Sequence, residues 1–165
     1  MQRLGLLFAT FLIAACAHKQ GVSSQNDTKN GAAIGFWAGR ISLQIQSEPV
    51  QAFFAGFELK GQADNGELTL ISPLGSILGI MRWTSSEAVL EQNGSIRRFA
   101  STDELLAQTT GAAVPVSALF DWLSGINTPT PGWLADLSQQ GNGRISAKRT
   151  APAPQADLRI VLDKQ

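Results

Sequence analysis

The sequence of 165 residues contains one cysteine and one histidine. The single cysteine, Cys16, excludes a disulfide within the chain and any zinc or iron–sulfur site built from several cysteines. The single histidine, His18, excludes most catalytic mechanisms that depend on histidine. The sequence also lacks P-loop, GxGxxG, HExxH, CxxC and GxSxG motifs, which mark nucleotide sites, metal sites and serine nucleophiles. We therefore expect that the protein is not an enzyme and that it has no cofactor and no metal site.

Charged residues are scarce and balanced. They make up 16% of the chain, and 13 Lys and Arg residues match 13 Asp and Glu residues. Without an excess of positive charge, a nucleic acid partner is not expected. Because 44% of the residues are hydrophobic, the chain can bury a core, and its composition argues against a disordered protein. The length is that of one domain with a tail.

The N-terminal 15 residues have the organisation of a secretory signal peptide. Arg3 precedes an uncharged run over residues 4–15. As a helix this run would span roughly 18 Å, short of a hydrocarbon core of about 30 Å, so a membrane-spanning helix is not expected. The run ends with Ile13-Ala14-Ala15 immediately before Cys16. This order resembles the lipobox of bacterial lipoproteins, in which the cysteine is acylated and becomes the new N-terminus.

We therefore predict three parts: a signal peptide over residues 1–15, a lipidated cysteine with a flexible tether over residues 16–35, and one domain over residues 36–165. The stretch after Cys16 is polar, contains glycines and has no hydrophobic periodicity, which is typical of a tether. Ala17 follows the cysteine where an Asp would resemble an inner-membrane retention signal. This favours the periplasmic face of the outer membrane, with acyl chains on Cys16 as a permanent anchor.

Hydrophobic periodicity predicts strands, then two helices, then further strands. Alternation of apolar residues predicts strands over residues 39–46, 50–60, 67–72, 76–83, 88–91, 96–99, 133–137, 144–149 and 158–163. Asn93-Gly94 favours a type I′ turn between two of them. A Ser-x-x-Glu capping box at Ser101 begins one helix, and helical spacing predicts another over residues 116–123. Without a βαβ alternation, this order predicts an antiparallel sheet curved over a short helical pair.

Adjacent charges offer no catalytic constellation. Asp103 and Glu104 stand at the start of a predicted helix, where carboxylates stabilise the helix dipole. Arg97 and Arg98 lie on a predicted strand. Because neighbours on a strand point to opposite faces, these two arginines favour a solvated edge over a joint binding site.

A leucine stands at the tip of a short loop between two predicted strands. Residues 72–76 read Ser-Pro-Leu-Gly-Ser, and Pro73 with Gly75 marks a turn. Leaving Leu74 in water forgoes roughly 1.5–3 kcal/mol of burial. Two interpretations stay open from the residues alone: Leu74 folds back onto the domain, or it meets an apolar partner.

Several short segments, taken in order together with the lipobox, resemble the LolB family. These are outer-membrane lipoproteins that receive other lipoproteins from the periplasmic carrier LolA and insert them into the membrane. The resemblance extends over residues 36–163. The segments that carry it are Gly39-Arg40, Ala55-Gly56-Phe57-Glu58-Leu59, Glu67-Leu68-Thr69-Leu70, Ser72-Pro73-Leu74-Gly75-Ser76, Asp103, Leu105-Leu106, Val114-Pro115-Val116 and Trp122-Leu123-Ser124-Gly125.

The resemblance implies a mainly β fold, an incompletely closed antiparallel β-barrel of about eleven strands that covers a few short helices and encloses an apolar cavity. It also implies that Leu74, between Pro73 and Gly75, enters the bilayer. The partners would be a LolA-type carrier, the acyl chains of client lipoproteins and outer-membrane lipid, and we expect a monomer. The candidates for the cavity, which the sequence does not separate from plain core, are Phe53, Phe57, Leu68, Leu70, Leu78 and Ile80. The alternative is a lipid-anchored scaffold or assembly protein without acyl-chain transfer.

Overall fold

The computed structural model describes residues 34–110 and 114–164. The predicted signal peptide, Cys16, His18 and nearly all of the tether lie outside the described residues. The elements are β1 (Gly35–Ile45), β2 (Gln51–Gln62), β3 (Asn65–Ile71), β4 (Ile77–Trp83), β5 (Ala88–Gln92), β6 (Ser95–Phe99), α1 (Thr102–Thr110), α2 (Val116–Leu123), β7 (Trp133–Asp136), the 3₁₀ turn η1 (Gln140–Asn142), β8 (Arg144–Arg149) and β9 (Ala156–Leu162).

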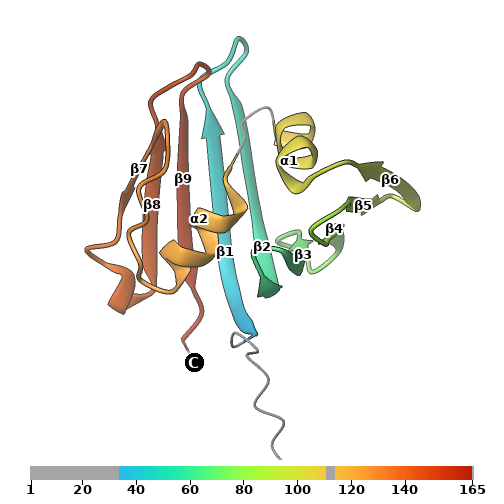
Figure 1. The fold of residues 1–165 in the computed structure, drawn as a ribbon, viewed down its shortest axis with the longest axis horizontal. Coiled ribbons are helices and arrows are strands. Elements are labelled where there is room, and N and C mark those ends of the chain that lie inside the picture. Colours follow the sequence, from blue (N-terminus) through green and yellow to red (C-terminus); the bar gives the residue numbers. More distant parts are fainter. Residues whose placement is uncertain (1–33, 111–113, 165) are drawn as a thin grey trace, which may run out of the picture. The chain divides into compact units, whose positions relative to one another are not determined.

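All nine strands belong to one antiparallel sheet with the order β6-β5-β4-β3-β2-β1-β9-β8-β7. The first six strands form a meander, and after the helices the chain adds β9, β8 and β7 along the other side of β1 (Figure 1). Strands β6 and β7 are the two edges, so the sheet is not closed. This confirms the predicted incompletely closed antiparallel β-barrel with short helices.

The strand count is lower than the about eleven that the resemblance implies for a partly open barrel. Nine strands form the sheet within the described residues. After the helices the chain supplies three strands, β7, β8 and β9, and β9 pairs with β1. These three strands extend the sheet without reaching β6.

Local sequence patterns account for most of the element boundaries. Helix α2 and strand β8 have the predicted limits. The β5–β6 turn has positive φ angles at Asn93 (51°) and Gly94 (74°), as a type I′ turn requires. Strand β1 begins at Gly35, earlier than predicted, because its ladder with β2 continues to the pair Gly35 and Gly61. The pairing partner therefore extends the strand beyond the alternating residues.

The core lies between one face of the sheet and the two helices. Helix α2 lies across β9 and β1 (Figure 1) and buries six of its eight residues. Its Phe120 meets Trp37 of β1 and Trp83 of β4 edge to face, with ring centroids 5.5 Å and 6.2 Å apart. Helix α1 buries Leu105 and Leu106. Of the helices in the described residues, none is long and apolar enough to cross a membrane.

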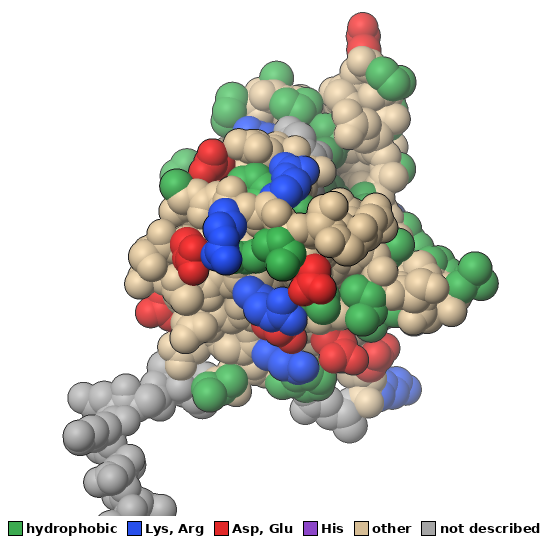
Figure 2. Space-filling view, turned by 90° about the vertical axis from the view of Figure 1, so that its right-hand side faces the viewer, with side chains coloured by type: hydrophobic (Ala, Val, Ile, Leu, Met, Phe, Trp, Pro, Cys, Tyr) green, Lys and Arg blue, Asp and Glu red, His purple; other side chains and the backbone are tan. Residues whose placement is uncertain are grey.

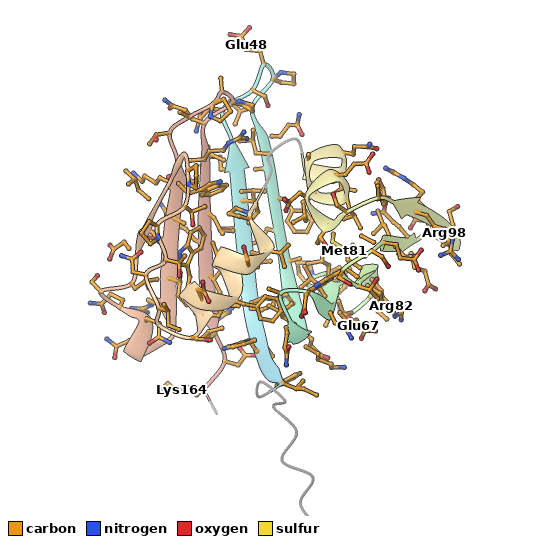
Figure 3. All side chains as sticks on the ribbon, in the orientation of Figure 1. Glu48, Glu67, Met81, Arg82, Arg98 and Lys164 are labelled. Atoms are coloured by element: carbon orange, nitrogen blue, oxygen red, sulfur yellow. The ribbon has the colours of Figure 1, made fainter. Side chains whose placement is uncertain are left out.

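The other face of the sheet carries charge. Arg82 on β4 contacts Glu67 at 2.8 Å and Glu91 at 3.2 Å, and hydrogen bonds to these two carboxylates raise the pKa of its guanidinium. Figure 3 shows Arg82 and Glu67 side by side. In Figure 2, Lys and Arg side chains alternate with Asp and Glu on the flank that carries β3 to β6. These exposed pairs contribute little to stability individually, and they keep this face wet.

Candidate functional site

An apolar groove lies between the core-facing side of the sheet and α1. Its open part has a volume of about 370 Å³, within the range of roughly 300–1,000 Å³ typical of small-molecule sites. Met81, labelled in Figure 3, lies on its wall, on the side of β4 that faces α1. The apolar residues that line the open part are Leu43, Ile45, Ala52, Phe53, Leu70, Leu78, Met81 and Leu90.

A smaller inner void of about 60 Å³ continues the groove beneath the helices. Leu106 of α1 and Leu119 of α2 contribute to its walls. Thr102 is the one polar side chain among the described residues that line it. The two parts share Leu43, Phe53, Leu70 and Met81. Voids with such walls stay dry and accept apolar ligands, so this inner part of the groove is suited to hydrocarbon.

Polar side chains surround the mouth of the open part. Gln51 and Gln92 stand at the ends of β2 and β5, and Gln108 and Thr109 lie in the last turn of α1. Arg97 of β6 completes this rim. A ligand in the groove would therefore have its hydrocarbon part against apolar walls and its end near hydrogen-bonding groups.

The structure separates the six predicted cavity residues. Phe53, Leu70 and Leu78 line the open part, and Leu68 lines the inner void together with Phe53 and Leu70. Phe57 is buried in the core and lines neither part. Ile80 pairs with Thr69 and Glu91 and lies on the charged face of the sheet. The groove thus brings four of the six together.

A β-bulge in the ladder between β3 and β4 determines which residues of β4 face the groove. Both sets of alternating residues on this strand are apolar, so periodicity alone does not decide which set faces inward. The ladder between β3 and β4 shifts at Leu70 and Ile71, so that Ile71 pairs with Ile77 and Leu70 with Gly79. Leu78, between these partners, turns into the groove.

Three other residues of the groove wall are missing from the six predicted cavity residues, although each lies on a strand that the sequence predicts. Leu43 and Ile45 belong to the alternating apolar set of the first strand and are buried at the groove. Leu90 stands on the hairpin strand β5. No sequence pattern predicts that Gln108 and Arg97 lie at the rim, because only the folded chain brings α1 and β6 to the same opening.

The loop over residues 72–76, called here the Leu74 loop, is a tight and well-bonded turn. The backbone N–H of Gly75 donates to the Ser72 carbonyl (2.9 Å), and the N–H of Ser72 donates to the Ser76 carbonyl (2.8 Å). Ser76 N–H also donates to Ser72 Oγ (3.1 Å). Gly75 has φ 84°, which strains other residues. Pro73 and a glycine two residues later are the preferences of a type I turn with a bulge.

Leu74 is 94% exposed at the tip of this loop. It therefore does not fold back onto the described part of the domain. Ile77, next to the loop, is 62% exposed. Phe54, which is 56% exposed, lies on β2 just beyond Gly56, the partner of Ile71. Where exposed apolar residues form a contiguous patch, they mark contacts with proteins or membranes, and these three residues lie on neighbouring segments of β2, β4 and the Leu74 loop.

The Leu74 loop rises from a wall of the groove. The strands on its two sides contribute Leu70, Leu78 and Gly79 to the open part. Strand β2 continues past the end of β3 with Phe53 and Gln51, which also line this opening. The protruding leucine and the groove are therefore parts of one structural region.

Comparison with known proteins decides the family. A sequence model described as "Outer membrane lipoprotein LolB" matches residues 36–156. The chain belongs to the LolB family. It is 36% identical to Outer-membrane lipoprotein LolB of Cupriavidus pinatubonensis over 152 residues, which cover 88% of this chain and 70% of that protein. The LolB of Cupriavidus metallidurans is 36% identical over 155 residues, covering 90% and 73%, respectively.

Family membership confirms the resemblance drawn from the short segments and the predicted outer-membrane location. It also confirms a role in lipoprotein localisation, which is the role of a transport protein. Lipid attachment at Cys16 stays a prediction, because this residue lies outside the described residues.

Proposed function

We propose that this LolB-family protein accepts lipoproteins from a LolA-type periplasmic carrier into its apolar groove and inserts them into the outer membrane. The observation that carries the proposal is the combination of an apolar groove with Leu74, which is 94% exposed on the loop that joins two of the wall strands, β3 and β4. The groove supplies a place for acyl chains, and Leu74 supplies a contact with the bilayer.

Hydration of acyl chains explains why such a groove is needed. A chain of about 15 methylene groups costs on the order of 10 kcal/mol to expose to water, at about 0.8 kcal/mol per methylene. Apolar walls offset this cost without a chemical step or a nucleotide. Transfer from the carrier proceeds if the groove holds the chains more tightly, and release follows because the bilayer is a better solvent still.

Phe53 stands where the two parts of the groove meet. Its side chain lines both the open part and the inner void and is 37% exposed. A chain that enters from the mouth would reach the inner void past this ring. The inner void of about 60 Å³ is small, so the open part would hold most of the hydrocarbon.

Delivery would begin at the Leu74 loop. With residues 1–15 removed, acyl chains on Cys16 and the tether up to residue 35 would hold the domain, residues 36–165, at the periplasmic face of the membrane. Insertion of Leu74 into lipid would regain roughly 1.5–3 kcal/mol of burial. Pro73 and Gly75 shape the turn that presents it, and Ile77 would add a second apolar contact.

Displacement of a hydrophobic fluorescent probe tests the function. The mature chain carrying Cys16→Ala would be used, because its own acyl chains would otherwise compete for the groove. We expect the probe to bind and an acylated lipoprotein to displace it, whereas the unacylated form of the same lipoprotein does not. A chain that binds no probe, or equal displacement by both forms, would contradict the proposal and favour the scaffold.

A further inference from the structure

One charged side chain lies on the core-facing side of the edge strand β6. Arg97 pairs with Leu90, which is 3% exposed, and shares its face with the buried Phe99. The guanidinium carbon of Arg97 stands 5.0 Å from the centroid of the Phe99 ring. The side chain therefore lies over an aromatic ring at the rim of the groove.

Its neighbour in sequence has a different environment. Arg98 points to the opposite face and contacts Glu87 at 3.3 Å, and Figure 3 shows it at the far edge of the sheet. The ion pairs recorded within residues 34–110 and 114–164 involve Lys60, Arg82, Arg98 and Lys148, but not Arg97. Arg97 thus brings a guanidinium with five N–H donors to the groove without a carboxylate partner there.

The other rim residues are neutral. Gln51, Gln92, Gln108 and Thr109 surround the same opening as Arg97. Beneath them the walls are apolar, so a bound chain would leave its polar end among these groups. In binding sites of this type a few polar groups fix the orientation of a largely apolar ligand.

We propose that Arg97 binds the carbonyl oxygens at the head of an acyl chain, in an ester or a carboxylate, while the hydrocarbon occupies the groove. The proposal rests on the proposed function and adds a determinant of orientation to it. Carbonyl oxygens only accept hydrogen bonds, and the guanidinium only donates them. Hydrogen bonds to a charged group are about twice as strong as neutral ones, so this contact would select acyl heads over bare hydrocarbon.

A purely structural role for Arg97 makes a different prediction. Inward-pointing charges on edge strands discourage pairing with another sheet, and β6 is an edge strand. In that case, loss of the charge would increase self-association and leave ligand preference unchanged.

The test compares three ligands of equal chain length: dodecanoate, its methyl ester and dodecane. Each would displace a hydrophobic probe from the mature chain carrying Cys16→Ala. We expect Arg97→Ala to weaken binding of dodecanoate and of the ester about tenfold or more and to leave dodecane unchanged. Arg97→Lys should retain part of the preference for dodecanoate. Arg98→Ala, the matched control on the other face, should bind all three ligands as the parent does.

Two results would overturn this role for Arg97. In the first, Arg97→Ala weakens the binding of all three ligands equally. In the second, Arg97→Ala leaves the binding of all three ligands unchanged, whether or not light scattering detects new self-association. If the parent chain binds dodecane while Arg97→Ala changes no preference, only this inference fails. If the parent binds none of the ligands, the proposed function fails with it.

Discussion

Two neighbouring phenylalanines on β2 show how a single residue step separates two roles. Phe53 points into the groove and lines both of its parts. Phe54 lies on the other face and is 56% exposed. The alternation of a strand assigns them to opposite faces, and its signal is readable in the sequence. The packing of the helices determines which of the two phenylalanines points toward the groove.

We expect Phe53→Ser to weaken binding of a fluorescent fatty acid about tenfold. Full burial of a phenylalanine side chain contributes about 1.5–3 kcal/mol, and the substitution removes the part of this burial that the ligand provides. Phe54→Ser should leave affinity unchanged. Both side chains are partly exposed, so both variants should fold, as circular dichroism would verify. Equal losses of affinity in the two variants would remove Phe53 from the binding site.

At the scale of elements, α1 forms one side of the groove and depends on its N-terminal cap. Glu104 N–H donates to Ser101 Oγ (3.1 Å), and Glu104 Oε2 accepts from the N–H of Ala100 (2.9 Å). The capping box predicted from the sequence is therefore confirmed, with the glutamate reaching one residue further back than Ser101. Thr102, Leu106 and Gln108 of the same helix line the groove.

Removal of this cap should destabilise the protein. Ser101→Ala leaves an N–H of the first turn without its acceptor, and we expect a loss of about 0.5–2 kcal/mol in the free energy of unfolding. Denaturant titration followed by circular dichroism measures it. Ser117→Ala, at an exposed site in the first turn of α2, is the control. A loss in the control as large as that in Ser101→Ala would show that the cap contributes nothing specific.

For the whole molecule, sequence patterns predicted much of the fold and less of the site. Alternation located the strands, and a capping box and helical spacing located the two helices, because these signals are local. The groove joins Gln51, Gln92, Arg97 and Gln108 from four different elements, and no local pattern reports such an assembly. The inward turn of Leu78 depends on a bulge between two strands. The residues alone do not predict the exposure of Leu74, because a turn sequence does not report what lies beside the turn.

The central claim is that an acyl chain leaves the groove for the bilayer by way of Leu74. The most direct measurement follows one acylated lipoprotein from a loaded LolA-type carrier to the full lipidated protein in liposomes, comparing the wild type with Leu74→Glu. Leu134→Glu is the matched control, because Leu134 is an exposed leucine (68%) on β7.

We expect Leu74→Glu to fold as the wild type does, since the side chain is 94% exposed and the loop is held by its backbone and Ser72. It should accept lipoprotein from the carrier and fail to release it into lipid, whereas Leu134→Glu delivers normally. Normal delivery by Leu74→Glu, or an equal failure of Leu134→Glu, would contradict the account.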